Sequence, residues 1–330
     1  MAVTSKDIAR ELNLSQPTVS RILNGDARHR ASDETRRRVH ETARRLGYQP
    51  NAVASSLRRG RTGIIGLHTN HDYDARNDFF GAIIGGLQRA CNPRGLDLLL
   101  HSALHGRPAE EMFDSLRNGR IDGLILHSGS DDPLVAMLSE SSLPVVSVAD
   151  THAGMTGVTC DDEAGMRLLM EHLWARGHRR FVYLAPEAML ASTEKRRDVF
   201  ECELKRRDVP PESRRVLRTH FEDVTPVLDE LLNGEPAVVC CWNDRTAYNL
   251  LHECAVRGVR VPEMLAVAGF DGFRDDKMPG SQLTTVGCPW PDVASRALTL
   301  LVEQIEARGN GDSSPREVCL PVSLLEGDTA

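Results

Sequence analysis

The chain lacks any long apolar run. No stretch approaches the roughly 20 consecutive apolar residues of a transmembrane helix, and the N-terminus has no apolar segment typical of a secretory signal peptide. We therefore expect a cytoplasmic protein that does not contact a membrane. Eight cysteines are present, but none forms a Cys-x-x-Cys pair: Cys91, Cys160, Cys202, Cys240, Cys241, Cys254, Cys288 and Cys319. Several lie in apolar runs, so we expect reduced, buried thiols rather than disulfides or metal ligands.

Signatures of catalysis are also missing. The sequence contains no nucleophile elbow, no His-Glu-x-x-His motif and no Walker A motif. The glycines in residues 81–86 lie within a helical pattern rather than after a strand, which argues against a dinucleotide fingerprint. One polar segment has a metal-like composition: His68, His71, Asp72 and Asp74. Its polarity favours a solvated role or a position lining a cleft, and we expect no metal, no cofactor and no enzymatic activity.

What the chain does contain begins with three short helices near its N-terminus. The first follows Thr4, a favourable N-cap, and has Asp7 three residues later as in a capping box. The second, within residues 15–24, carries Pro17 in its first turn, where a missing N–H costs nothing. The third, residues 32–46, precedes a glycine that can terminate it. The spacing is typical of a helix-turn-helix, although a plain three-helix bundle remains an alternative.

The second of these helices has a polar outward face. Its members are Gln16, Pro17, Thr18, Ser20 and Arg21. A recognition helix presents such N-terminal side chains to the major groove. Arginine can bond guanine and glutamine can bond adenine, whereas serine and threonine more often hold phosphates. Pro17 has no donor, so we expect base specificity to depend on Gln16 and Arg21.

Charge is divided unevenly along the chain. Residues 1–62 contain 13 Lys and Arg against 6 Asp and Glu, whereas residues 63–330 contain 27 against 41. A basic N-terminal segment on an acidic body is typical of a module that binds nucleic-acid phosphates.

The rest of the 330-residue chain alternates short apolar runs with amphipathic stretches. The predicted strands are residues 64–68, 96–101, 123–127, 145–149, 181–185, 238–242 and 265–270. The predicted helices between them include residues 79–91, 163–176, 196–207, 245–257 and 293–307. Such alternation is typical of parallel sheets with helices on both faces, and the strands suffice for two sheets.

Several motifs together resemble the LacI/GalR family of bacterial transcription regulators. They are Thr18-Val19-Ser20-Arg21 with Asn24-Gly25, Ser32-x-x-Thr35-Arg36, and Leu46-Gly47-Tyr48-x-Pro50-Asn51-x-x-Ala54-x-x-Leu57. The resemblance implies an all-α helix-turn-helix domain (1–47), a hinge helix and linker (48–62), and an α/β body like periplasmic binding proteins. Two doubly wound parallel-sheet lobes are then expected: residues 63–160 with 290–318, and 161–289 with 319–330.

The resemblance also implies DNA contacts by position. Gln16, Pro17 and Arg21 match base-reading positions, and Leu57 matches a leucine that enters the minor groove. Positions that hold phosphates are matched by Ser5, Thr18, Ser20, Asn24, Tyr48 and Asn51, with Ala54 in the same hinge segment. The segment 51–57 is too short to be a stable helix alone, so we expect it to fold with a partner copy on DNA. The alternative role for Leu57 is that of a linker residue packed on the body.

The loop between the second and third helices is longer than is usual in the family. It contains Arg28, His29 and Arg30, which either reach additional phosphates or are simply solvated.

Candidate effector ligands follow the strands of the body, where ligands bind doubly wound sheets. By resemblance, Arg196, Asn243 and Asp271 match polar effector positions, and Trp290 matches an aromatic wall. Further candidates complete the expected set: Asp78, Phe79, His127 and Ser192. Arginine and aspartate suit a polyhydroxylated ligand, since both make directional, charge-assisted hydrogen bonds.

Structural roles are the alternatives at three of these positions. Asp271 can cap a turn, Asn243 and the adjacent Asp244 can cap the next helix, and Trp290 can be core. The family usually carries an aspartate where this chain has Ala149, with Asp150 next, which leaves one expected ligand contact open.

These features predict a ligand-responsive regulator, most simply a repressor. We expect a homodimer on a near-palindromic double-stranded operator, with a small-molecule effector, a sugar or sugar derivative, between the lobes. A solute-binding protein is a second hypothesis, against which the basic N-terminal segment argues. A sugar-modifying enzyme is a third, which turnover of candidate sugars would support.

Overall fold

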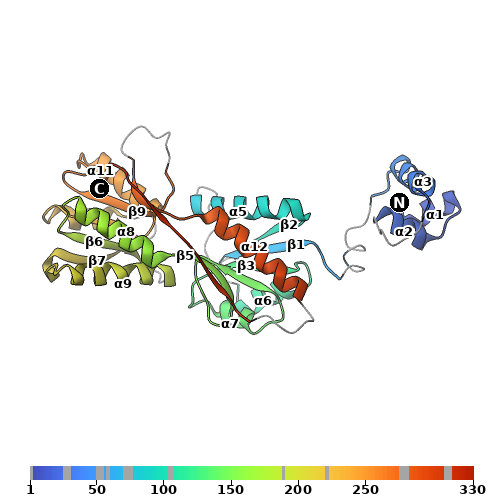
Figure 1. Ribbon diagram of the computed structural model, residues 1–330, viewed down its shortest axis with the longest axis horizontal. Coiled ribbons are helices and arrows are strands. Elements are labelled where there is room, and N and C mark those ends of the chain that lie inside the picture. Colours follow the sequence, from blue (N-terminus) through green and yellow to red (C-terminus); the bar gives the residue numbers. More distant parts are fainter. Residues whose placement is uncertain are drawn as a thin grey trace. The chain divides into compact units, whose positions relative to one another are not determined.

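The computed structural model divides the chain into two compact units, Met1–Gly63 and Ile64–Ala330. Figure 1 shows both units, coloured along the sequence. The structure describes residues 3–24, 31–49, 56, 60–69, 77–102, 107–187, 190–219, 223–274, 282–307 and 314–330.

The first unit is a helix-turn-helix of three helices: α1 (Ser5–Leu12), α2 (Gln16–Leu23) and α3 (Asp33–Arg45). Its core contains Ile8, Val19, Ile22 and Val39, one apolar stripe from each helix. The predicted helix starts are confirmed. The Asp7 carboxylate accepts hydrogen bonds from both the N–H and the hydroxyl of Thr4, at 3.0 and 2.7 Å.

The first lobe of the second unit is built on a parallel sheet in the order β11-β5-β4-β3-β1-β2. Its strands are β1 (Ile64–Thr69), β2 (Asp97–Ser102), β3 (Gly123–His127), β4 (Val145–Val148), β5 (Thr156–Cys160) and β11 (Glu317–Leu320). Its helical segments are α5 (Asp78–Cys91), η1 (Asn92–Arg94), α6 (Ala109–Arg117), α7 (Pro133–Ser139) and α12 (Trp290–Ala307).

The second lobe repeats this plan in the order β12-β10-β9-β8-β6-β7, with only β12 antiparallel to its neighbour. Its strands are β6 (Phe181–Pro186), β7 (Arg214–Thr219), β8 (Val238–Cys241), β9 (Ala266–Asp271), β10 (Thr284–Gly287) and β12 (Ser323–Leu325). Its helical segments are α8 (Asp162–Ala175), α9 (Ala191–Arg206), η2 (Pro211–Ser213), α10 (Thr225–Leu232) and α11 (Asp244–Val256).

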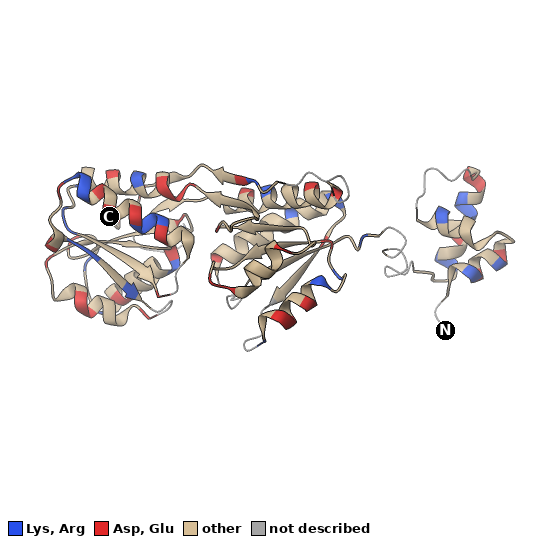
Figure 2. Ribbon diagram, turned by 90° about the horizontal axis from the view of Figure 1, so that it is seen from below, with Lys and Arg blue, Asp and Glu red and all other residues tan. Residues whose placement is uncertain are grey.

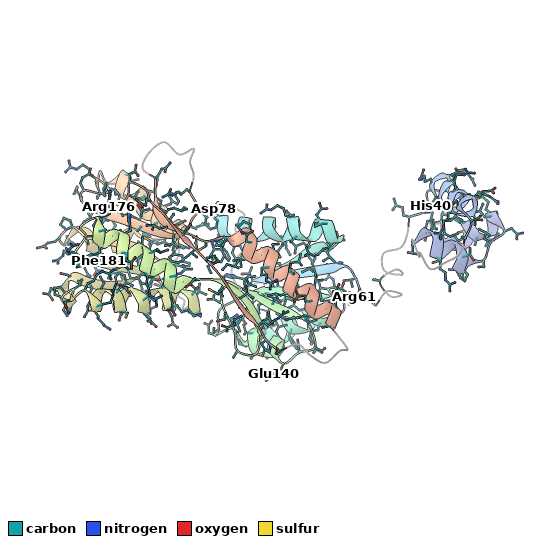
Figure 3. The ribbon with its side chains drawn as sticks, viewed as in Figure 1. His40, Arg61, Asp78, Glu140, Arg176 and Phe181 are labelled. Carbon is teal, nitrogen blue, oxygen red and sulfur yellow. The ribbon has the colours of Figure 1, made fainter. Side chains whose placement is uncertain are left out.

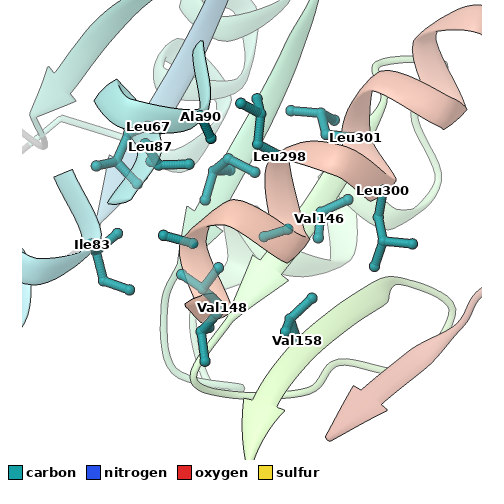
Figure 4. Close-up of a cluster of buried hydrophobic side chains, with 14 of the residues drawn as sticks. Leu67, Ile83, Leu87, Ala90, Val146, Val148, Val158, Leu298, Leu300 and Leu301 are labelled. Atoms are coloured by element: carbon teal, nitrogen blue, oxygen red, sulfur yellow. The ribbon is translucent and has the colours of Figure 1, made fainter. Parts of the chain in front are cut away.

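Strand residues alternate between two cores in each lobe, because successive side chains of a strand point to opposite faces. In β6, Phe181 and Tyr183 pack with α8 and α9, whereas Val182 and Leu184 pack with α10 and α11. In the first lobe, Ile125 of β3 joins the cluster with α5 and α12 that Figure 4 shows. Burial on both faces explains why these strands are continuous apolar runs.

The chain passes between the lobes three times. It leaves the first lobe after β5, returns between β10 and α12, and passes again between β11 and β12. Cys288 and Val322, in the second and third passages, pack against the main cores of both lobes. These passages bring the segment that follows β4 close to the first turn of α9, as the hydrogen bond from Ser192 N–H to Asp150 shows.

The structure differs from the sequence expectations at a few points. The predicted strand 145–149 ends at Val148, because Ala149 has a left-handed φ of 71°. Cys202 and Cys319 are exposed, so the expectation of buried thiols is wrong for these two. Among the residues described, no helix combines the length and apolarity needed to cross a membrane.

Candidate functional site

The outward face of α2 is the first candidate site. Gln16, Pro17 and Arg21 are exposed, and Val19 and Ile22 on the opposite face are buried. Ser15 caps the helix by accepting a hydrogen bond from the Thr18 N–H at 3.3 Å. The cap and the packed inner face hold the outward side chains on a rigid element, as recognition of base edges requires.

Neighbouring polar side chains support this face. The Gln16 Nε2 amide donates to the Ser5 Oγ at 3.3 Å, which joins α1 to α2. The Asn24 amide turns back to the carbonyl of Ser20. Tyr48 packs against the helical core. Asn51, Ala54, Leu57 and the loop residues Arg28, His29 and Arg30 lie outside the described residues.

Figure 2 colours the lysines and arginines of this unit blue and its aspartates and glutamates red. One of its ion pairs, between Arg45 and Glu11, joins α3 to α1. Arg21 and Arg38 are exposed on α2 and α3. Exposed cations on a compact helical unit can meet phosphates without rearrangement of the fold.

A second candidate site lies where the two lobes meet. We call it the interlobe site and define it by Asp150, Asp162, Ser192, Arg196, Asn243, Asp271 and Trp290. Each of these residues lies at or just after a strand end, or in the first turns of a helix, and each is at least nine-tenths buried. Parallel strands of doubly wound sheets place their carboxyl ends at the same edge, which explains the clustering.

Arg196 is the central cation of the interlobe site. Its Nε donates to Asp162 Oδ1 at 2.7 Å, and its Nη1 donates to the Trp242 carbonyl at 2.7 Å. Its guanidinium lies over the Phe270 ring, 3.7 Å from the centroid. Burial by itself would lower the pKa of Arg196, but the charges of Asp162 and Asp271 have the larger, opposite effect. The pKa is therefore raised overall, and the side chain stays charged. A guanidinium has five N–H donors, so donors remain for a ligand.

Asp271 ends β9 in a strained conformation, with a φ of 129°. Burial raises the pKa of this carboxyl well above its usual range, whereas the nearby Arg196 acts in the opposite direction. Strain and a shifted pKa at a strand end are typical of functional positions.

Aromatic rings border the site on the first lobe. The Phe79 ring lies 4.9 Å from Trp290 and 4.9 Å from His127, measured between centroids. Trp290 is 2 % exposed and belongs to the core of the first lobe. The alternative predicted from the sequence, that Trp290 is a core residue, is therefore confirmed. His68, from the metal-like set, is also buried and its Nδ1 faces the His101 carbonyl at 3.1 Å.

Two of the expected effector residues have local roles that the structure makes clear. Asn243 caps α11, because its Oδ1 accepts the Thr246 N–H at 2.8 Å. Asp78 is exposed at the beginning of α5, where Figure 3 labels it, and no hydrogen bond or ion pair among the described residues joins it to the interlobe site.

Three carboxylates were not chosen from the sequence. Asp162 binds Arg196, Asp150 reaches from the first lobe to α9, and Asp244 accepts hydrogen bonds from Thr285 and from the Phe273 N–H. Two of them have a sequence signal: Asp150 lies beside the position where the resembling family carries an aspartate, and Asp244 directly follows the candidate Asn243 after the predicted strand 238–242.

Two known family models match parts of the chain. The model described as "Bacterial regulatory proteins, lacI family" matches residues 4–51, and the model described as "Periplasmic binding protein-like domain" matches residues 170–330. The chain therefore carries a LacI-type helix-turn-helix domain followed by a periplasmic binding protein-like domain. Its curated relatives are transcription regulators rather than enzymes.

Two curated relatives illustrate the likeness. Catabolite control protein A of Priestia megaterium is 29% identical over 314 residues, covering 92% of each chain. The HTH-type transcriptional repressor PurR of Vibrio atlanticus is 27% identical over 324 residues, again covering 92% of each.

Solved structures show the same fold. The lac repressor dimer bound to operator and the anti-inducer ONPF has a TM-score of 0.83 at 22% identity, covering 100% of this chain and 99% of that one. A complex of the transcriptional regulator CelR with cellobiose has a TM-score of 0.73 at 23% identity, covering 99% and 100%. At these identities the likeness concerns the fold alone.

Proposed function

We propose that this protein is a ligand-responsive repressor of the LacI family that binds a near-palindromic operator as a homodimer. The observation that carries the proposal is the rigid, exposed row Gln16, Pro17 and Arg21 on the capped helix α2 of a basic unit. A dimer with two-fold symmetry binds a DNA site with two-fold symmetry. The Gln16, Pro17 and Arg21 side chains of each copy therefore contact one half-site each. In this proposal Ser5, Thr18, Ser20, Asn24 and Tyr48 hold phosphates around them.

The effector binds at the interlobe site in this proposal. Arg196 retains unused donors beside Asp271, and the rings of Phe79 and Trp290 offer apolar surface for sugar C–H groups. Binding there favours one arrangement of the lobes and thereby shifts the population competent for DNA. Structures of related regulators hold cellobiose and ribose, which supports a sugar or sugar derivative as the ligand class.

Selection of bound duplexes from a random DNA library tests the proposal. We expect the full chain to enrich a palindrome with a flexible central step, first without ligand and then with ribose or cellobiose added. Arg21→Ala should lose base preference at one position in each half-site, at a cost of about 1–3 kcal/mol on the preferred sequence. Sequencing of the enriched pools measures both effects.

Arg37→Ala is the matched control. Arg37 is an exposed arginine on α3 that lies 3.9 Å from Glu41 in an ion pair. Its removal should leave the enriched motif unchanged. An unchanged motif with Arg21→Ala would show that Arg21 reads no base, and no enrichment under any of these conditions would contradict the operator proposal.

A further inference from the structure

One loop beside the interlobe site carries three buried polar atoms that make no hydrogen bond of normal geometry with another described residue. Asp150 is 2 % exposed, and its Oδ2 has no partner among the described residues. Two residues later, His152 is 6 % exposed, and neither of its ring nitrogens makes a hydrogen bond of normal geometry. Buried polar atoms are nearly always paired in native proteins. Three unpaired atoms on one loop therefore indicate a place for a polar ligand group.

The position of the Asp150 carboxylate is determined from both sides. Ala149 has a left-handed φ of 71°, a conformation that costs a non-glycine residue on the order of 1 kcal/mol. This left-handed residue follows β4 directly, and the side chain of the next residue, Asp150, extends to the second lobe. There Asp150 Oδ1 accepts the Ser192 N–H at 2.8 Å.

That contact replaces a missing helix cap. The N-cap of α9 is Leu190, whose side chain cannot accept a hydrogen bond. The first N–H groups of a helix need acceptors and favour negative charge. Asp150 therefore caps α9 from the other lobe, which holds the carboxylate in place and leaves Oδ2 available.

Charge favours a cation at Oδ2. Arg196 is already paired with Asp162, and no lysine or arginine among the described residues forms an ion pair with Asp150. Asp150 also contributes to the raised pKa of Asp162, which follows mainly from burial. A buried carboxylate without a counter-charge is unfavourable.

The adjoining imidazole supplies an acceptor. Burial lowers the pKa of His152, although Asp150, a hydrogen bond to the Ser128 backbone and Asp132 act in the opposite direction, so the ring is neutral at neutral pH. A neutral imidazole has one nitrogen that accepts a hydrogen bond.

We propose that Asp150 and His152 form a subsite for a primary ammonium group of the effector. The ammonium donates to Asp150 Oδ2 and to the unprotonated nitrogen of His152. Because the other oxygen of Asp150 caps α9, an amine held here joins the two lobes. This inference rests on the proposed effector role of the interlobe site, and it adds a chemical class, an amine such as an amino sugar or a simple amino alcohol.

Matched amine and alcohol pairs test this subsite in the full chain. Ethanolamine is compared with ethylene glycol, and D-glucosamine with D-glucose, in phosphate buffer at equal ionic strength. Thermal unfolding and calorimetric titration report binding. We expect each effective amine to bind about tenfold or more tightly than its alcohol, as a charge-assisted hydrogen bond implies. A response to ethanolamine indicates a simple amine, and a response to glucosamine alone indicates an amino sugar.

Asp150→Asn separates the subsite from a general charge effect. The asparagine retains an oxygen that can accept the Ser192 N–H but loses the charge, so the preference for amines should disappear. Asp131→Asn removes the same charge from an exposed residue and should retain the preference. His152→Phe keeps a planar ring without nitrogens and should weaken amine binding several-fold.

Equal binding of amine and alcohol by the unmodified protein, absence of amine binding, or a preference that survives Asp150→Asn would each overturn the subsite. Failure of the regulator proposal is distinguishable. A protein that enriches an operator motif and responds to a neutral sugar, but not to amines, remains a regulator without this subsite.

Discussion

At the scale of single residues, Arg196 combines contacts that stabilise the fold with the effector-binding role proposed above. Its two hydrogen bonds join α9 to the beginning of α8 and to the end of β8, and its guanidinium covers Phe270. The same group presents its remaining donors to the interlobe site. A substitution here therefore changes the fold as well as any ligand response, and the two effects need separate measurements.

Arg196→Met should lower the free energy of unfolding by about 3–5 kcal/mol, because it leaves the buried Asp162 carboxylate without its cation. Urea denaturation measures this loss. Arg206→Met is the control, because Arg206 is 62% exposed and its partner Glu203 also binds Arg207. That change should cost less than about 1 kcal/mol. Similar losses for the two variants would contradict a special role for the Arg196–Asp162 pair.

Asp244 gives stability a dependence on pH. Burial raises its pKa from 3.8 to about 7, although the Thr285 hydroxyl and two backbone N–H groups act in the opposite direction. The folded protein thus favours the protonated carboxyl. This contribution to the free energy of unfolding is highest below about pH 4 and falls as pH rises to 7, by at most about 1.4 kcal/mol per unit.

Asp244→Asn removes that titration. Between pH 5 and pH 7 the unmodified protein should therefore lose stability relative to the variant. Urea denaturation at several pH values gives the difference between the two proteins, and a difference that stays constant with pH would refute the assignment.

At the scale of elements, the contact of α5 with α12 depends on a close approach of two helices, which lie side by side in Figure 1. Gly86 permits it, since a Cβ at this position would lie 2.7 Å from the Ala294 Cβ and 2.8 Å from the Pro291 carbonyl oxygen. The contact positions Trp290, the first residue of α12, against Phe79. A helix contact thus sets one wall of the interlobe site.

Two alanine substitutions in α5 should have opposite signs. Gly86→Ala should lower the free energy of unfolding by about 1–3 kcal/mol, because backbone atoms of α12 must move. Gly81→Ala meets no atom within 4 Å and should raise it by up to about 1 kcal/mol through higher helix propensity. Denaturant unfolding of both variants decides the matter, and stabilisation by Gly86→Ala would show that the helices are not in tight contact.

At the scale of the whole molecule, opposite charge is divided between the two units. The basic excess lies in residues 1–62 and the acidic excess in the remainder. DNA phosphates attract the basic residues 1–62 and repel the acidic remainder of the chain. Charge therefore favours DNA binding through the helix-turn-helix unit. The acidic body also opposes non-specific attachment through other surfaces.

Operator affinity should therefore depend steeply on salt. If each dimer meets six to ten phosphates, the binding constant should fall by about 10³–10⁵ between 50 and 200 mM salt. Filter binding or fluorescence anisotropy on the enriched operator measures the slope. A change of less than about tenfold would be inconsistent with phosphate-dominated contact.

The sequence alone determined the features that depend on neighbouring residues. Thr4 with Asp7, Ser15 and Ser32 predict the helix starts, because capping needs only residues three apart. Buried strands such as β3 and β6 were predicted because both faces are apolar. The edge strand β7 was missed, since its arginines and exposed faces hide the apolar pattern.

Only the tertiary structure decided how the interlobe site is assembled. Asp162 and Arg196 are 34 residues apart, and Asp150 and Ser192 are 42 apart, so no local pattern could pair them. The left-handed turn at Ala149 moves the expected carboxylate by one residue, to a place where it caps a helix of the other lobe. Such contacts arise from the packing of elements that are distant in the sequence. The sequence therefore indicated a polar ligand site at the strand ends, whereas the tertiary structure determined which side chains contact one another there.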